Sequence, residues 1–583
     1  MSGLNNGNGE MRFFTDQLMI ELAHQLIEKG VVRRDQIDDL NSRRSITGET
    51  LDRMLVKEGL VSDNDLLAIL SGLTNIPFRH IAELRIDLAA VKKVPPRIAL
   101  RHNVMPIGIS NGMMSLATSQ VPSATTVDGL RMLLDMGIAW ILCTEVDITK
   151  SIKHFYGLGA ETVDNLVDAS AKSTMDLQAT DVSVETTDDG VVKFVNQIIF
   201  EAIKMDATDI HIEPFENDLR LRYRIDGILQ EIPVPQGVAQ LRKSMSSCVK
   251  IMAEMNIAER RKPHDGRIKV KSGKEEFDLR VSVLPTAHGE TVCMRILNRK
   301  TMFIDLEHLG LSRGQLPKIT YLADLPHGVV LLTGPTGSGK TTTLYAVLSK
   351  ISTSDVKIIT VEDPIEYQLF GINQIQVHPQ IGLTFANVLR HILRHDPDII
   401  LIGEIRDSET ADIAVRSSLT GHLVFSTLHT NDAPSSVTRL SDMEVEPYLI
   451  ASCLEGVIAQ RLVRRVCSAC KEEVAAPEII IQEIAEKQPA ERVKNAKYYK
   501  GRGCPDCNFT GYRGRIAICE IMLLDDALRA MIVHQRPSNE IKKKALENGM
   551  ETLRRDGWNR VLDGLTTIDE IVRVAKADSM GGN

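Results

Sequence analysis

The stretch from Gly334 to Thr341 (GPTGSGKT) carries the clearest chemistry in this chain. It fits the pattern G-x-x-x-x-G-K-[ST], in which glycines let backbone N–H groups turn toward a phosphate and a helix N-terminus adds partial positive charge. The lysine of this pattern reaches the β- and γ-phosphates, and the final hydroxyl binds Mg²⁺. The sequence therefore predicts a nucleoside triphosphate site. The residues expected to contact the nucleotide are Gly334, Pro335, Thr336, Gly337, Ser338, Gly339, Lys340, Thr341 and Thr342.

The segments around this loop follow the order that a phosphate loop requires. Gly328–Thr333 (GVVLLT) is an apolar run typical of a buried strand, and Thr342–Lys350 has the pattern of a helix. Strand and helix patterns then alternate from Leu309 to about Arg461. Such alternation indicates an α/β domain with a mostly parallel sheet, of the RecA-like P-loop ATPase kind.

Three further segments place polar side chains at the ends of predicted strands. Ile358–Glu366 ends in acidic residues around a proline, Asp398–Glu404 ends in Gly-Glu, and Thr420–His429 ends in a polar tip. Because parallel strands present their carboxyl ends at one edge of a sheet, these side chains are expected near the phosphates. Glu404 takes the place of the aspartate that usually ends a Walker B strand.

Five motifs in this order resemble those of the secretion ATPase family, which drives type II secretion and type IV pilus assembly. Besides the phosphate loop, these are Glu362–Glu366, similar to the family's aspartate box, Gly403–Asp407, similar to its variant Walker B motif, Thr420–His429, similar to its histidine box, and Thr208–Pro214 with Arg222–Gly227, similar to the signature of its second N-terminal domain. The resemblance covers roughly residues 190–583. It implies a hexameric motor that hydrolyses ATP with Mg²⁺.

The resemblance also implies roles for the acidic residues. Glu366 is the expected general base that orients water at the γ-phosphate, and Glu404 is expected to hold Mg²⁺ through water. Glu362 and Asp363 are expected to support the metal side.

The histidines and arginines are assigned in the same way. His422 and His429 are expected to read the nucleotide state, with a structural role as the alternative for each. Transition-state charge spreads onto the γ-oxygens, where a fixed, forked cation is a good partner. The arginines that the resemblance places there are Arg280, Arg295, Arg390 and Arg394, each with a surface or interdomain ion pair as its alternative.

Four of the nine cysteines form two close pairs, Cys467 with Cys470 and Cys504 with Cys507. Two C-x₂-C knuckles suit a closed tetrahedral Zn²⁺ site, with a redox dithiol as the alternative. The 33 residues between the pairs require an inserted hairpin or helix at Pro477–Glu486. Within the family, this element resembles the assembly and secretion branch. The remaining cysteines, Cys143, Cys248, Cys293, Cys453 and Cys519, stand in apolar surroundings and are expected to be small core residues.

The first 156 residues are expected to form a docking module. Leu26–Ser42 and Leu55–Ser71 align 29 residues apart, which predicts two copies of a helix pair joined at a glycine. Val91–Asn103 is then expected to be a helix and residues 105–108 and 114–117 to be strands. This front repeat resembles a cyclic-di-GMP-binding module.

Each repeat departs from that module at its start. The family's Arg-Leu-Gly is replaced by Glu21-Leu22-Ala23 in one copy and by Thr50-Leu51-Asp52 in the other. The loss of both arginines and both glycines argues against cyclic-di-GMP binding and favours docking on inner-membrane anchor and platform proteins.

Composition changes divide the rest of the chain. Residues 157–188 read as an acidic linker, 189–305 as a second α+β domain with an alternating strand at Leu219–Asp226, and 306–583 as the ATPase domain. The last of these includes a cysteine element at 465–512 and a helical region at 520–583.

Composition also limits the function. The net charge of −8 and the 4% aromatic content argue against a nucleic-acid motor. No apolar run approaches the roughly 20 residues of a membrane span, and a secretory signal is missing, so a cytoplasmic location at the inner membrane is expected. The segment Thr438–Ile450 favours type II secretion, and pilus assembly remains the alternative.

Overall fold

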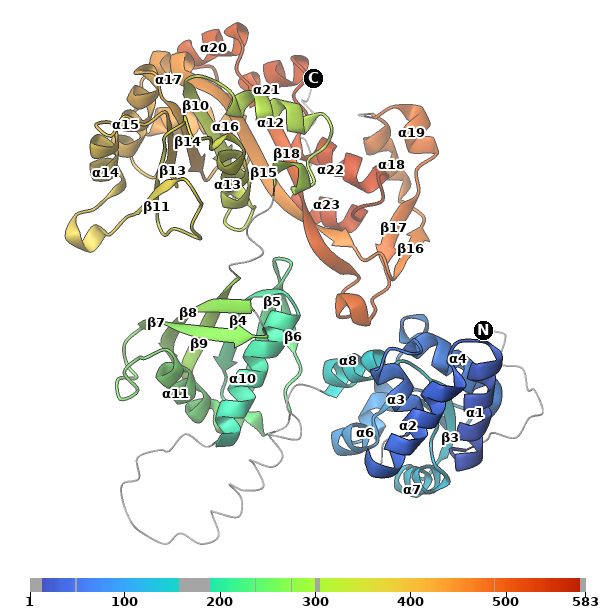
Figure 1. Ribbon diagram of the computed structural model, residues 1–583. Helices are drawn as coiled ribbons and strands as arrows, with labels where there is room; N and C mark the ends of the chain where they lie inside the picture. Colours follow the sequence, from blue (N-terminus) through green and yellow to red (C-terminus); the bar gives the residue numbers. More distant parts are fainter. Residues whose placement is uncertain are drawn as a thin grey trace. The chain divides into compact units, whose positions relative to one another are not determined.

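Figure 1 shows the chain as a computed structural model that describes residues 13–47, 50–156, 189–235, 237–273, 275–298, 305–486 and 488–576. Two compact units make up the chain, one from most of residues 1–296 and the other from most of residues 297–583. The predicted acidic linker, residues 157–188, lies outside the described residues.

The first described elements are two helix pairs, α1 (Asp16–Glu28) with α2 (Arg34–Thr47) and α3 (Leu51–Lys57) with α4 (Asp63–Thr74). Each pair turns at a glycine in the left-handed region, Gly30 at φ +67° and Gly59 at φ +68°, where other residues are strained. Leu22 of α1 and Leu66 of α4 belong to one shared core. The predicted repeat of helix pairs is confirmed.

A small α/β part follows, with η1 (Ile81–Glu83), α5 (Leu88–Lys93), α6 (Pro96–His102), β1 (Val104–Ser110), β2 (Met113–Thr118), α7 (Ala124–Leu134), β3 (Gly137–Leu142) and α8 (Glu145–Tyr156). Its sheet has the order β1-β2-β3, and both predicted strands are confirmed. The predicted continuous helix Val91–Asn103 is wrong. Val94 is extended because the ring of Pro95 disfavours helical backbone at the residue before it, so the helix divides into α5 and α6.

The second domain is an antiparallel sheet with two helices. Its elements are α10 (Asp189–Lys204), β4 (Ala207–Pro214), β5 (Leu219–Ile225), β6 (Ile228–Ile232), η2 (Val238–Leu241), α11 (Arg242–Met252), β7 (His264–Ser272), β8 (Glu275–Thr286) and β9 (Gly289–Asn298). The sheet order is β6-β5-β4-β9-β8-β7. Residues of β5 alternate between buried and half-buried, as predicted, and its buried Tyr223 donates a hydrogen bond to the Ile198 carbonyl of α10 at 2.8 Å.

A seven-stranded sheet is the centre of the ATPase domain, with the order β12-β11-β13-β14-β10-β15-β18. Its strands are β10 (Gly328–Thr333), β11 (Ile358–Glu362), β12 (Asn373–Gln376), β13 (Ile399–Ile402), β14 (Leu423–Leu428), β15 (Leu454–Val466) and β18 (Tyr512–Leu523). Only the β15–β18 pair is antiparallel in this described sheet. The predicted α/β fold of the RecA-like kind is confirmed.

Helices cover both faces of this sheet: η3 (Leu306–His308), α12 (Gln315–Ala323), α13 (Lys340–Ile351), η4 (Pro379–Ile381), α14 (Phe385–Ile392), α15 (Ser408–Leu419), α16 (Pro434–Asp442) and α17 (Pro447–Cys453). In β10, Val329 and Leu331 belong to one core cluster and Val330 and Leu332 to another, because successive side chains point to opposite faces. Each such burial stabilises the fold by about 1.5–3 kcal/mol, which keeps the strand ends in fixed positions.

A long ribbon of β15 and β18 leads from the sheet to the cysteine element (Figure 1). That element contains β16 (Lys471–Val474), α18 (Glu478–Ala485), α19 (Ala490–Lys494), β17 (Tyr498–Gly501) and η5 (Pro505–Cys507). The predicted insertion at Pro477–Glu486 is the helix α18, which together with α19 lies between the two strands of a hairpin. The chain ends with α20 (Asp526–Val533), α21 (Ser538–Glu547), α22 (Leu553–Leu562) and α23 (Ile568–Val574). The prediction of helix from residue 520 is wrong at its start, because Glu520–Leu523 still pair with β15.

Candidate active site

The phosphate loop lies between β10 and α13, as the motif predicts. Gly334 (φ +149°) and Gly339 (φ +84°) both have backbone conformations that other residues rarely adopt. A Cβ at Gly334 would lie 2.5 Å from the Gln460 carbonyl oxygen, and one at Gly339 would lie 2.9 Å from Gln460 Nε2. The loop is therefore packed tightly against β15, and glycine is required at both positions.

The other loop residues divide between the surface and the interior. Ser338 is buried, whereas Pro335, Thr336, Gly337 and Thr341 are exposed, and Thr342 is half-buried in the first turn of α13. The structure thus presents one face of the loop to solvent. Contact of these residues with nucleotide stays a prediction.

Lys340 is held by the loop itself. Its Nζ donates to the carbonyl oxygens of Gly334 at 2.7 Å and Pro335 at 3.2 Å, and the residue is only 9% exposed. Burial lowers the pKa of Lys340 to about 8, and this effect is opposed by the nearby Glu404 carboxylate and supported by the Arg461 guanidinium. The charge that a phosphate would meet is therefore already partly desolvated.

We expect nucleotide affinity to depend on pH through Lys340. With a pKa of about 8, the ammonium is charged below this pH and loses its proton as the pH rises through it. A bound phosphate favours the charged form, so ADP affinity should be constant near pH 7 and fall by up to about tenfold per pH unit above about pH 8. Calorimetry across this range measures the effect, and Lys340→Met should bind weakly with a flat profile. A flat profile for the unmodified chain would contradict the prediction.

Adjacent strands bring several motif residues to the same edge of the sheet. Register pairs the last residues of β10 and β14, Thr333 with Leu428, and β13 lies next to β14. Consequently His429 follows β14 beside the loop, and its Nε2 lies 3.5 Å from Glu404 Oε2, just beyond β13. The structure thus groups the phosphate loop, Glu404 and His429.

Arg406 joins this group, although no role is predicted for it from the sequence. Its guanidinium is hydrogen-bonded to Glu404 Oε1 and lies 3.9 Å from Asp363 Oδ2. The Glu404 hydrogen bond raises the pKa of Arg406 further. Asp363 and Glu366 are exposed in the segment after β11. Arg406 therefore connects the carboxylates that follow β11 and β13.

Glu362 does not lie where a metal-side carboxylate is expected. It is 3% exposed, and its carboxylate accepts hydrogen bonds from the Tyr345 hydroxyl of α13, from Thr360 Oγ1 at 2.6 Å and from Gln374 Nε2 at 3.1 Å. As the last residue of β11, it points into the domain while Asp363 points outward. In this structure the Glu362 carboxylate joins α13 to β11 and β12, and its expected role on the metal side stays a prediction.

His422 is also displaced from the expected position. It precedes β14 at the amino end of the sheet, where its carbonyl accepts from the Gly328 N–H, and its Nδ1 lies 2.8 Å from the Ser417 carbonyl oxygen. The six residues of β14 separate it from the phosphate edge by about 20 Å. Within this chain His422 therefore lies away from the phosphate loop, and its role in reading the nucleotide state stays a prediction.

The four predicted arginines lie in two different domains. Arg390 of α14 pairs with Glu409 of α15, and Arg394 Nη1 donates to the Arg390 carbonyl at 3.1 Å. Arg295 of β9 donates through Nε to Asp209 Oδ1 at 3.0 Å, and Arg280 lies half-buried on β8. Arg280 and Arg295 belong to one compact unit and Arg390 and Arg394 to the other, and their placement at the γ-phosphate stays a prediction.

The cysteine pairs meet as predicted. All four thiols are buried, and the sulfur atoms of Cys467, Cys470, Cys504 and Cys507 lie within 4.8 Å of one another. The Cys504 and Cys507 sulfurs are 3.7 Å apart, close to the spacing of about 3.8 Å that four sulfurs at 2.3 Å from a tetrahedral Zn²⁺ would have. The donor set therefore fits a closed structural Zn²⁺ site.

We expect the purified chain to contain about one zinc per molecule. Cys504→Ser should lose the metal and melt at a lower temperature, because one ligand and its charge are removed. Cys519→Ser is the matched control, since Cys519 is equally buried but lies outside the cluster, in β18. Elemental analysis and thermal melting check both variants. Retention of zinc by Cys504→Ser would contradict the assignment.

The other cysteines are buried, as expected of core residues, with one exception. Cys143, Cys248, Cys453 and Cys519 are buried. Cys293 is only partly buried, and charged side chains lie near it. Burial and the nearby Asp209 raise the pKa of its thiol, whereas Arg295 lowers it. Its position on β9 opposite His211 explains this polar environment.

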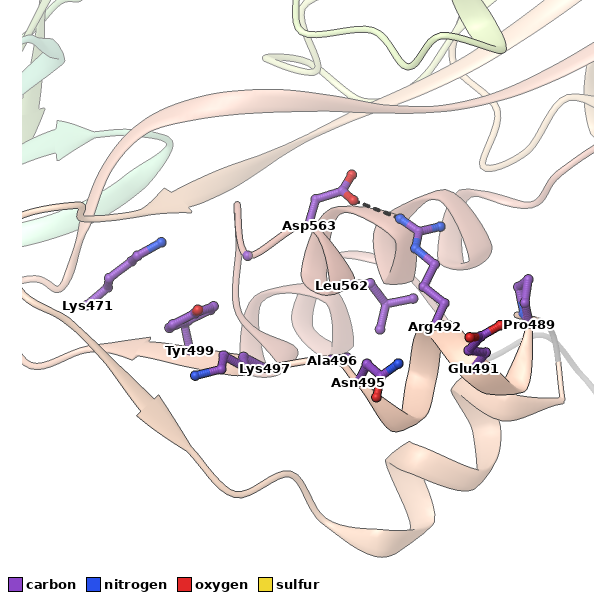
Figure 2. A pocket seen from close by; sticks show the side chains of 11 residues that line it. Lys471, Pro489, Glu491, Arg492, Asn495, Ala496, Lys497, Tyr499, Leu562 and Asp563 are labelled. Carbon is purple, nitrogen blue, oxygen red and sulfur yellow. Dashed lines mark hydrogen bonds and ion pairs between the residues drawn. The ribbon is translucent and has the colours of Figure 1, made fainter.

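A cavity of about 650 Å³ is lined by residues of the cysteine element and of the end of α22 (Figure 2). Lys471, Tyr499 and Arg492 line it, together with Asp563 at the end of α22. Its charges are largely used within the chain, since Arg492 pairs with Asp563 at 2.7 Å and Lys471 lies over the Tyr499 ring. Nothing in this arrangement competes with the phosphate edge as a catalytic centre.

Comparison with known proteins agrees with this geometry. A family model described as Type II/IV secretion system protein matches residues 164–573, and one described as MshEN domain matches residues 74–162. Within the described ranges, no helix has the length and apolar character needed to cross a membrane.

Two similar proteins cover nearly the whole chain. The type IV pilus assembly ATPase PilB of Myxococcus xanthus is 40% identical over 560 residues, which is 94% of this chain and 98% of the relative. The type II secretion system protein E of Xanthomonas campestris pv. campestris is 43% identical over 568 residues, which is 95% of this chain and 98% of the relative. Among solved structures, the crystal structure of the pilus retraction motor PilT with bound ADP is similar at 26% sequence identity and a TM-score of 0.45. The match covers 65% of this chain and 96% of the PilT chain. The chain is therefore an ATPase that belongs to the type II/IV secretion system protein family.

Proposed function

We propose that this ATPase is the hexameric motor of a type II secretion machine, in which ATP hydrolysis powers pseudopilus assembly at the inner membrane. The observation that supports this most is the grouping of Lys340, Glu404, Arg406 and His429 at the carboxyl edge of the sheet. A phosphate loop, a carboxylate and nearby cations are the parts that phosphoryl transfer to water requires.

Each residue of the site has a separate role in ATP hydrolysis. The β- and γ-phosphates of ATP lie in the loop against Lys340, and Glu366 orients the attacking water and accepts its proton. When bound, Mg²⁺ neutralises phosphate charge, with Thr341 and Glu404 as its partners in the chain. Arg406 holds the Glu404 carboxylate in place.

Coupling to movement rests on the arginines. Arg280 and Arg295 belong to the 189–305 domain, whereas the phosphate loop belongs to the 306–583 domain. Contact of these arginines with the γ-phosphate would therefore favour one angle between the domains, and loss of that phosphate would release it. Arg390 and Arg394 of the ATPase domain complete the cationic set.

The N-terminal 156 residues serve to dock the motor. We propose that this module binds an inner-membrane anchor or platform protein, which places the ATPase on the cytoplasmic face of that membrane. Cyclic-di-GMP is not the expected ligand, because both Arg-Leu-Gly starts are replaced. Calorimetry of the full chain with cyclic-di-GMP tests this, and micromolar affinity would overturn it.

The motor proposal is tested by measuring mass and turnover together. The full chain should assemble to six copies in the presence of a non-hydrolysable ATP analogue, and specific ATPase activity should rise with protein concentration as the ring forms. Full activity in a stable monomer would rule out the hexameric mechanism.

Pilus assembly is the second candidate, and the match to PilB over 94% of this chain supports it. The two functions differ in the filament that the motor extends. Deletion of the gene in its host, followed by assays of exoprotein release and of surface pili, separates them. Loss of exoproteins with normal pili is the expected result, and the reverse would favour pilus assembly.

A further inference from the structure

Gln460 makes more contacts with the phosphate loop than its place in the sequence suggests. It lies on β15, 1% exposed, far along the chain from the loop. Its side-chain Nε2 donates to the Ser338 carbonyl at 2.9 Å, and its Oε1 accepts from the Thr343 hydroxyl of α13 at 2.9 Å. One amide thus joins the middle of the loop to the helix that follows it.

The backbone of the same residue touches the loop at its start. A Cβ at Gly334 would meet the Gln460 carbonyl oxygen at 2.5 Å, and that oxygen also accepts from Arg461 Nη1 at 3.1 Å. Arg461 Nη2 in turn donates to the Asn431 carbonyl at 3.1 Å, just beyond the histidine that lies near Glu404. Arg461 therefore helps to hold the Gln460 backbone in place, and it also contacts the segment after β14.

We propose that Gln460 is a positioning residue that keeps the phosphate loop in its nucleotide-binding shape. The inference rests on nucleotide binding by this loop and not on which machine the motor drives. The Ser338 carbonyl needs a donor and the Thr343 hydroxyl needs an acceptor, and a neutral amide supplies both from one side chain. Because Gln460 already orders the loop and the helix before nucleotide binds, the binding free energy is not spent on ordering them.

Other side chains cannot meet both needs. Gln460→Met keeps the volume but leaves the buried Ser338 carbonyl and Thr343 hydroxyl without this partner. Gln460→Glu replaces the donor to Ser338 by a carboxylate oxygen and adds negative charge behind the phosphate site. Both changes are expected to weaken ADP binding by about tenfold or more, with the larger loss for Gln460→Glu.

Calorimetry of the full chain with ADP and Mg²⁺ tests this, with Gln315→Met as the matched control. Gln315 is also a buried glutamine, and both the nitrogen and the oxygen of its side-chain amide are hydrogen-bonded. Its Nε2 donates to the Cys519 carbonyl at 3.3 Å and its Oε1 accepts from Arg560 at 3.1 Å, but it does not touch the loop. Both variants should melt at lower temperature, whereas only Gln460→Met should lose ADP affinity. In steady-state assays Gln460→Met should raise KM while kcat changes little, because the loop binds substrate and transition state alike.

Thr343→Val gives a second route if Gln460→Met fails to fold. It removes the hydroxyl that donates to Gln460 without changing β15, and it should weaken ADP binding severalfold. In Gln460→Met the further loss from Thr343→Val should be small, because the two groups form one interaction. Equal ADP affinity in the unmodified chain, Gln460→Met and Thr343→Val would overturn the proposal. If the unmodified chain bound no ADP, the nucleotide site itself would be wrong.

Discussion

Lys340→Ala should lose at least about a thousandfold in ATP turnover, and its affinity for ADP should fall as well. Lys340 is the buried cation of the loop, held by the carbonyls of Gly334 and Pro335, and alanine leaves no charge to meet the β- and γ-phosphates. In a water-excluded site, removal of one such group costs about 10²–10³ in rate, and lost binding adds to this.

The control for Lys340 lies on the same helix. Lys350 pairs with Glu307 at 3.1 Å near the other end of α13. Lys350→Ala removes a lysine from α13 without touching the loop, so its turnover should stay within about twofold of normal, in line with the small worth of an exposed ion pair. Near-normal turnover by Lys340→Ala would contradict the loop assignment.

Glu366→Gln is expected to separate binding from chemistry. The proposed role of Glu366 is to take a proton from water, which a neutral amide cannot do, and loss of a general base costs about 10²–10⁴ in rate. Glu366 is exposed beyond β11, so the substitution should leave the fold and the ADP affinity intact. Steady-state turnover and calorimetry measure the two effects.

Glu362→Gln provides the contrast. Its carboxylate is buried and accepts from Tyr345, Thr360 and Gln374, so the substitution should lower the melting temperature. It should affect the rate less than Glu366→Gln does. If Glu366→Gln hydrolysed ATP faster than Glu362→Gln, the roles assigned to the two glutamates would have to be exchanged.

The sequence was most informative where a local pattern determines the structure. The apolar run Gly328–Thr333, the glycines of the loop and the alternation in β5 each predict an element from neighbouring residues alone. Pro95 also carries a local signal, because a proline disfavours helical backbone at the residue before it and so divides Val91–Asn103 into two helices.

The remaining differences come from contacts between distant residues. The direction in which Glu362 points depends on Tyr345 and Gln374, and the importance of Gln460 depends on how β15 packs behind the loop. The motif that contains His422 also contains His429, but a six-residue strand places them at opposite edges of the sheet. A shared motif therefore did not mean a shared site.

We propose that residues of two domains act on one nucleotide. Arg295 and Arg224 offer a matched pair to test this, because both lie beside the buried Asp209. The Nε atom of Arg295 lies 3.0 Å from Asp209 Oδ1, and that of Arg224 lies 3.6 Å from Asp209 Oδ2. Substitution of either one by alanine removes an ion pair with the same carboxylate, but only Arg295 is assigned to the γ-phosphate.

The decisive measurement is the steady-state rate of ATP hydrolysis by full-length Arg295→Ala and Arg224→Ala under conditions where both assemble. Arg295→Ala should lose about 10²–10³ in kcat with unchanged ADP affinity, and Arg224→Ala should stay close to normal. Near-normal turnover in both variants would contradict the assignment of Arg295 to the γ-phosphate.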